Sequence, residues 1–245
     1  MSVLDRQFAT SSIMAVGIAI GGFLAGHGIA RVRAEDRYVT VKGISEREVR
    51  ADLAIWTIKI VAADNDLSVA NAHIQNDIKQ VRQFLARHKL DSGQAELQDF
   101  AVADAETNQY VNPTGRGTRY VIRQAIVVRS KGPDVVLAAS QQVAELVSAG
   151  VVLSTNEEYR TGGLTFVFSG LNKLKPEMIA EATARAREGA EQFARDAHSP
   201  LGSIRQASQG VFSILPRDQV QGVMEAGQIA KTVRVVSTVE YFLKN

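Results

Sequence analysis

The sequence predicts an α+β protein, in which helices cover an antiparallel or mixed sheet, preceded by one N-terminal transmembrane helix. Three observations lead to this fold class. Residues 8–30 contain no Asp, Glu, Lys or Arg. After residue 37, segments with the two-residue alternation of strands occur between segments with the helical spacing of apolar residues. The composition is otherwise globular, with 28 Lys+Arg, 26 Asp+Glu and 45% hydrophobic residues.

The chain has 245 residues and no cysteine. It is long enough to bury a substantial hydrophobic core without disulfides or structural metals. The missing cysteine also excludes thiolate zinc sites, iron–sulfur clusters and cysteine nucleophiles.

The uncharged segment 8–30 is long enough to cross a bilayer. As a helix it would extend roughly 35 Å, against a hydrocarbon core of about 30 Å. We interpret residues 1–7 as a tail, 8–30 as the anchor, 31–37 as a linker and 38–245 as the folded domain. Two alternatives to the anchor are a secretory signal peptide, cleaved after a small residue such as Gly26 or Ala30, and a buried helix of a soluble protein.

Four glycines in the anchor have the spacing that lets two membrane helices approach closely. They form two G-x-x-x-G pairs and are the predicted helix-contact residues: Gly17, Gly21, Gly22 and Gly26. The alternative is that they make no dimer contact, since glycine is common in membrane spans. The basic residues do not settle the orientation, because Arg6 precedes the segment and Arg31, Arg33 and Arg37 follow it.

The first half of the domain is predicted to contain four strands and one helix. The helix is capped by Asp66 or Ser68, and its apolar face repeats at helical spacing through Ile74, Ile78, Val81 and Leu85. Because both faces of the second strand are apolar, we expect it to be central. The strands cover residues 38–42, with Gly43 as the stop, 53–61, 96–102 and 118–130.

The second half is predicted to contain two helices and four strands. The first helix starts at Pro133 and ends at Gly150, with Val136, Val143 and Val147 facing the core. The second is long and alanine-rich, runs from residue 172 to 197, and has Phe193 as its large apolar anchor. The strands cover residues 151–154, 164–169, 204–215 and 232–243.

In this order of elements, strand–helix–strand–strand occurs twice, around the first helix and around the third. We interpret it as a βαββ structural pseudo-repeat. The alternative is an irregular α+β domain, since no residue identity links the halves.

The sequence contains no nucleotide-binding loop, zinc-protease motif or serine-hydrolase elbow. Its four histidines lack the spacing of metal ligands, so we expect no catalytic residue, cofactor or metal. Arg119, Arg123 and Arg129 recur along one strand without interleaved aromatic residues, which predicts a solvated face or a subunit contact and no nucleic-acid binding. A rival hypothesis is a ligand pocket or active site built from separate strands, where Asp52, Glu158 or Arg123 would act.

Several segments, taken in order, resemble the SIMPL domain family, formerly DUF541. The stretches 39–43 (VTVKG) and 49–54 (VRADLA) resemble its two opening strands. Ala149-Gly150 before residues 164–168, the alanine-rich helix followed by Leu201-Gly202, and the strand from residue 232 to 242 resemble its later segments. The chain departs from the family pattern in having Lys42-Gly43-Ile44-Ser45 in place of G-x-G, and no proline before Asp52.

The resemblance implies a bacterial envelope protein that forms large ring-like or channel-like homo-oligomers and is linked to stress tolerance. It implies no enzymatic activity. We therefore expect a single-pass inner-membrane protein with its C-terminal domain in the periplasm, or a periplasmic protein after signal cleavage. No motif in the sequence identifies a small-molecule ligand. The alternative functions are a ligand-binding protein or enzyme, and an adaptor that binds a partner at a free sheet edge.

Overall fold

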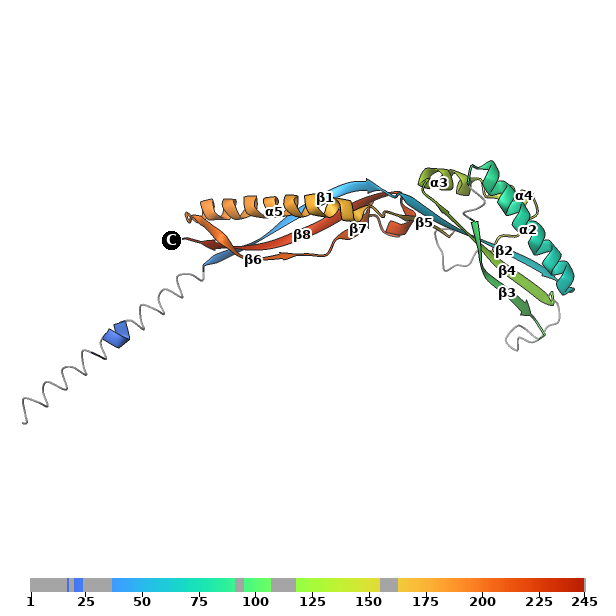
Figure 1. Cartoon of the computed structure of the whole chain (residues 1–245), viewed down its shortest axis with the longest axis horizontal. Coiled ribbons are helices and arrows are strands. Elements are labelled where there is room, and N and C mark those ends of the chain that lie inside the picture. Colours follow the sequence, from blue (N-terminus) through green and yellow to red (C-terminus); the bar gives the residue numbers. More distant parts are fainter. Residues whose placement is uncertain are drawn as a thin grey trace, which may run out of the picture. The chain divides into compact units, whose positions relative to one another are not determined.

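The computed structural model describes residues 17, 20–23, 37–90, 95–106, 118–154 and 163–244 (Figure 1). The described chain forms two compact units. Unit 1 holds the described residues up to Ser45, together with 176–212 and 235–244. Unit 2 holds the described residues within 46–175 and 213–234. Both units combine helices with strands, so the α+β fold class is confirmed.

Unit 2 is built on an antiparallel sheet with the strand order β3-β4-β2-β5. Strand β2 lies inside this sheet because it pairs with β4 on one side and β5 on the other, which confirms its predicted central position. The strands are β2 (Leu53–Asp64), β3 (Ala95–Asp104), β4 (Tyr120–Ser130) and β5 (Leu164–Val167).

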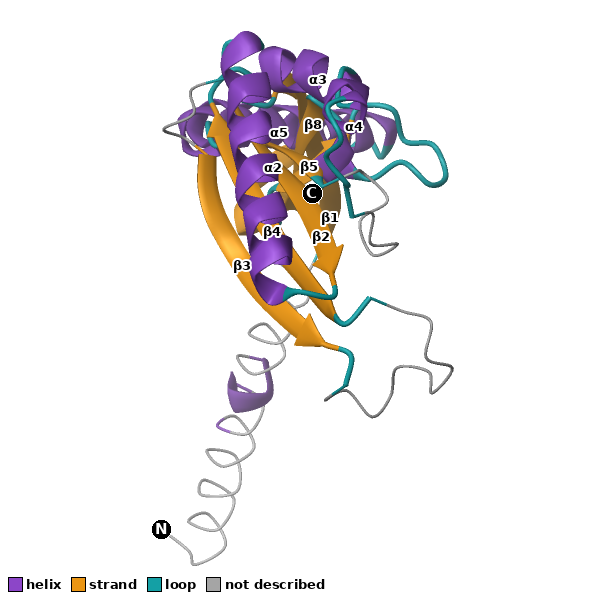
Figure 2. Ribbon diagram, turned by 90° about the vertical axis from the view of Figure 1, so that its right-hand side faces the viewer, coloured by secondary structure: helices purple, strands orange, loops and turns teal. Residues whose placement is uncertain are grey.

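Helix α2 (Leu67–Arg87) covers one face of this sheet and packs on β2 and β4 (Figure 2). Its N-cap is Asp66, whose carboxylate accepts the backbone N–H of Ser68 at 2.7 Å. The predicted apolar face is confirmed, since all four of its residues are buried together with Phe84. Trp56 of β2 meets Phe84 edge-on, with ring centroids 6.2 Å apart.

The predicted helix 133–150 is two helices, α3 (Pro133–Gln141) and α4 (Ala144–Ser148). The break at Gln142–Val143 turns the second helix, so Val136 is buried as predicted whereas Val147 is exposed. The predicted strand 151–154 is reduced to one bridge between Leu153 and Ile60. Unit 2 also contains β7 (Ser213–Pro216) and the short 3-10 helix η2 (Glu225–Gly227).

Unit 1 places one helix on strands β1, β8 and β6, with β8 between the other two (Figure 1). The elements are β1 (Tyr38–Arg50), α5 (Leu171–Asp196), β6 (Leu201–Gln209) and β8 (Ala230–Leu243), and unit 1 contains only part of β1, α5 and β8. The predicted strand 204–215 is two strands, β6 and β7, with Gly210 between them.

Two predictions about unit 1 are wrong for one physical reason. Gly43 does not end β1, because the strand continues through it to Arg50. A side chain at Gly43 would overlap the Ala182 carbonyl oxygen and the Ala186 nitrogen, so glycine is there for close packing on α5. The helix correspondingly buries alanines from this contact onward, and Phe193, the predicted anchor, is 59% exposed. The buried face consists of Met178, Ala182, Ala186, Ala190 and Ala194.

The two predicted copies of the βαββ pseudo-repeat differ in strand pairing. The first copy, β2-α2-β3-β4, forms a single sheet with its helix on one face. The first strand of the second copy is β5, which pairs with β2 and not with the strands after α5. The structure therefore repeats the order of elements but not the sheet.

Most of the predicted anchor lies outside the described residues. Among those described, no helix is long and apolar enough to cross a membrane. Three of the four predicted contact glycines, Gly17, Gly21 and Gly22, are described, and a Cβ built on any of them would meet no described atom within 4 Å beyond its chain neighbours and its own helix backbone. Gly26 is outside the described residues.

Candidate functional site

The candidate site is the edge strand β3 of unit 2. Strand β3 pairs with β4 on one side, and no described strand pairs with its other side. Three apolar side chains on this strand are about half exposed, with Leu97 at 45%, Phe100 at 56% and Val102 at 47%. An edge strand with exposed apolar side chains offers both backbone hydrogen bonds and apolar contact to a further strand.

The apolar residues of β3 lie on the same side of the sheet as the core. Leu97 is opposite Ile126 and Val102 is opposite Ile122, and both isoleucines are buried in the core of unit 2. Directly opposed residues of an antiparallel pair point to the same face. Leu97 and Val102 therefore extend the core outward, beyond the strands on which α2 packs.

A β-bulge divides the strand. Residues 98 and 101 of β3 are opposite 125 and 123 of β4, so β3 has one extra residue in the register. Asp99, within the bulge, accommodates the extra residue by adopting a positive φ of 55°. The buried Gln124 side chain stabilises the bulge by donating to the Gln98 carbonyl oxygen at 2.6 Å. A partner strand must therefore match two short ladders, which restricts non-specific pairing.

Ion pairs link the two ends of β3 to β4 and to the residue just before it. Arg129 donates to Glu96 at 2.7 Å, and Arg119 lies 3.4 Å from Asp104. The hydrogen bond from Arg129, followed by that from Gln98, lowers the pKa of Glu96. The pKa of Asp104 is lowered chiefly by the backbone N–H of Glu106, with Arg119 adding to it. Arg119 and Arg129 therefore stabilise β3 within the sheet, whereas Arg123 is exposed on β4.

The alternation of residues 96–102 predicts a strand, but it does not by itself mark the apolar residues of that strand as exposed. The sequence does carry a signal. Leu97 has an odd number whereas Phe100 and Val102 have even numbers, so the apolar alternation changes phase between 97 and 100. A change of phase within a strand is what one inserted residue produces, because the side-chain period is two.

Asp52, one of the rival catalytic candidates, has a structural role. Its carboxylate accepts the backbone N–H of Ser169 at 2.9 Å and the Ser169 hydroxyl at 2.8 Å. Burial raises the pKa of Asp52, but these hydrogen bonds outweigh it and leave the pKa below its usual value. Glu158, another of these candidates, lies outside the described residues, and Arg123 is exposed on β4.

Lys231 of β8 is the most unusual charged residue in unit 2, since its side chain is fully buried. Its Nζ donates to the Glu225 carbonyl oxygen at 2.7 Å and forms an ion pair with the Glu225 carboxylate. Both acceptor groups belong to Glu225 of η2, so Lys231 fixes this turn against β8. A buried ammonium that is paired and hydrogen-bonded is accounted for structurally.

The described residues bring no three His, Asp or Glu side chains close enough to hold a metal ion. His73 lies on α2 and His88 at its C-cap. His88 lies 3.3 Å from Glu145 of α4 and packs on Phe84.

The family comparison matches residues 39–241 to SIMPL, described as a protein of unknown function (DUF541). No curated protein matches the chain. The matched range covers both units and most of the chain, including every strand and helix described above from β2 to β7. The chain therefore belongs to the SIMPL family.

Proposed function

We propose that this protein is a non-enzymatic, membrane-anchored envelope protein whose SIMPL domain assembles into a homo-oligomeric scaffold or channel-like ring. The observation that carries the proposal is strand β3, with its half-exposed Leu97, Phe100 and Val102 at the edge of a sheet. Pairing of this edge with a second copy would bury these side chains and satisfy the outward backbone groups.

Residues 8–30 provide the proposed anchor, because they contain no acidic or basic side chain apart from His27. Membership of the SIMPL family supports a single-pass inner-membrane protein with its domain in the periplasm. The alternative location is the periplasm, after cleavage of the same segment. Mass spectrometry of the N-terminus of the purified protein distinguishes the two.

The test of assembly is the mass of the full chain in detergent, measured by light scattering at several concentrations. We expect a discrete oligomer that Val102→Lys dissociates. An unpaired ammonium in an apolar contact costs more than about 1.4 kcal/mol, so the dissociation constant should rise about tenfold or more.

The matched control is Val147→Lys in α4, because Val147 is an exposed valine of the same unit away from β3. This variant should assemble like the wild type. A wild-type monomer at every concentration would refute self-assembly, and the free edge would then favour the adaptor hypothesis, in which β3 binds a different protein. Equal dissociation by both variants would mean that the contact is elsewhere.

A further inference from the structure

One end of unit 1 gathers three segments that are distant in sequence. The backbone N–H of Leu243 donates to the Arg37 carbonyl oxygen at 2.8 Å, and that of Lys244 donates to Pro200 at 2.9 Å. The Ser199 hydroxyl donates to the Lys244 carbonyl oxygen. The start of β1, the turn after α5 and the end of β8 therefore meet where the chain enters the folded domain.

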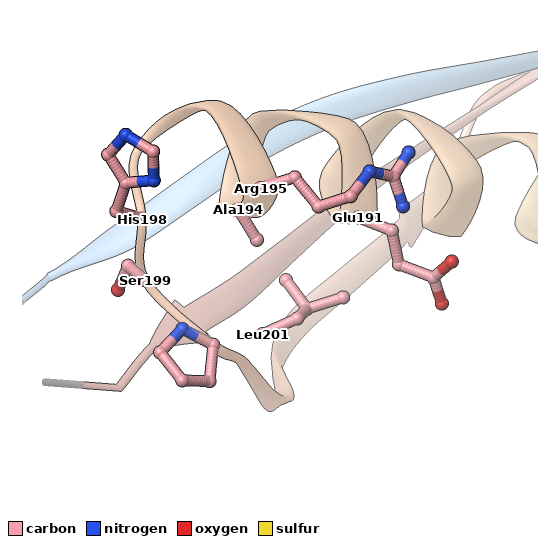
Figure 3. A pocket seen from close by; sticks show the side chains of 7 residues that line it. Glu191, Ala194, Arg195, His198, Ser199 and Leu201 are labelled. Carbon is pink, nitrogen blue, oxygen red and sulfur yellow. The ribbon is translucent and has the colours of Figure 1, made fainter.

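A surface hollow of about 400 Å³ lies at this end, between the last turns of α5 and the start of β6 (Figure 3). Arg195 and His198 line it together with apolar Ala194, Pro200 and Leu201. Glu191 also lines it, but its charge is offset by Arg187, whose Nε donates to it at 3.0 Å. Asp196 accepts the side-chain amide of Gln192 at 2.9 Å.

Phe193 adds an exposed aromatic ring to the same end of α5. At 100° per residue, Phe193 and Arg195 lie on opposite flanks of the helix. The last turn therefore carries a basic side chain on one flank and an aromatic ring on the other, with exposed Arg37 just before β1 and exposed Lys244 just after β8. Aromatic rings and basic side chains together are typical of surfaces that contact the membrane interface.

We propose that this end of unit 1, comprising Arg37, Phe193, Arg195, His198 and Lys244 and called here the α5 end, rests on the surface of the membrane that holds residues 8–30. Its ligands are the anionic phospholipid headgroups of that membrane. The inference depends on the anchor proposed above. The linker from residue 31 to 37 is seven residues long and spans at most about 25 Å. It therefore holds the α5 end close to the bilayer surface.

The lack of native cysteine permits a direct test with single labelled cysteines in the full chain. Ala197→Cys places a fluorophore on the exposed turn of the α5 end. The matched control is Gln209→Cys, exposed at the far end of β6 and about 27 Å along the strand from Leu201. Both variants are reconstituted in vesicles of phosphatidylcholine, alone or mixed with phosphatidylglycerol, that contain a headgroup-linked quencher.

We expect the quencher to act on position 197 and much less on position 209, with the difference larger when phosphatidylglycerol is present. In the labelled Ala197→Cys background, Arg195→Gln should lower the ratio of docked to undocked protein on anionic vesicles about fivefold, the usual effect of one basic residue at a membrane surface. Lys42→Gln, an exposed lysine elsewhere in unit 1, should leave the ratio unchanged.

Flotation of the same vesicles separates failure of the inference from failure of the anchor. If the protein floats with the vesicles and both labels are quenched equally, the anchor stands and docking of the α5 end is refuted. If quenching at position 197 is the same with and without phosphatidylglycerol, anionic headgroups are not the ligand. If the protein does not float, the anchor and the docking are both refuted.

Discussion

Asp77 of α2 is a carboxylate placed among the apolar side chains of unit 2. It is 8% exposed, and its helix neighbours Ile74, Ile78 and Val81 are all buried. Burial raises the pKa of Asp77, and the charge of His73, one turn earlier, lowers it only in part. The folded state therefore binds this proton more tightly than the unfolded state does.

We predict that Asp77→Asn increases the free energy of unfolding at neutral pH. A carboxyl group whose pKa is raised by folding destabilises the protein as the pH rises from 3.8 through the raised value. The variant should therefore gain stability above that range and none below pH 3.8. Urea unfolding followed by the fluorescence of Trp56, which lies in the same core, measures the effect. A loss of stability at pH 7 would mean that the Asp77 carboxylate has a stabilising partner.

Helix α5 and strand β1 illustrate how close packing selects small residues over large ones. Gly43 touches the helix backbone at Ala182 and Ala186, so the helix face there has no room for larger side chains. Phe193, further along the helix and next to the buried Ala194, is 59% exposed. The helix thus buries its alanines because the strand approaches it closely.

We predict different effects of alanine at two glycines near this contact. Gly43→Ala pushes a methyl group into the backbone of α5 and should cost about 3 kcal/mol or more of stability. Gly189→Ala is the matched control, since its methyl group would lie 3.9 Å from Val41, an ordinary contact. Alanine also favours a helix interior over glycine by about 1 kcal/mol, so this variant should be neutral or stabilised.

Thermal unfolding monitored by circular dichroism compares the two variants. A tolerated Gly43→Ala would show that β1 and α5 can separate without loss of stability, and the close approach would then not explain the alanine face.

The sequence predicts elements well where large apolar residues carry the periodicity. Helix α2 follows from its isoleucines, valine and leucine at helical spacing, and the structure buries all of them. The face of α5 was not predictable in this way, because alanine contributes little to the apolar pattern and Phe193 outweighs it. The exposed apolar residues of the candidate site were not predicted for a related reason. The bulge at Asp99 interrupts the alternation of β3, so the strand lacks a regular apolar face in the sequence.

At the scale of the whole molecule, the sequence identifies the strands but not the sheet that each one joins. Strand β5 immediately precedes α5, yet it pairs with β2, more than 100 residues earlier in the chain. Local periodicity contains no information about such pairing. The resulting cores are unequal: the cluster of unit 2 includes Trp56, Phe84 and many isoleucines, whereas that of unit 1 consists of Val41, Ala186, Ala190, Val239 and Tyr241.

This difference predicts that unit 1 opens more easily than unit 2. Burial of a leucine or isoleucine side chain stabilises a helix contact by about 1.5–3 kcal/mol, and burial of alanine by much less. Backbone amides of α5 between residues 176 and 196 should therefore exchange with deuterium at least tenfold faster than those of α2, because each 1.4 kcal/mol changes the open population tenfold. Hydrogen exchange of the full chain in detergent, analysed by mass spectrometry, compares these two helices in one sample. Equal protection of both would show that the two units open together, so that the large core of unit 2 also stabilises the alanine face of α5.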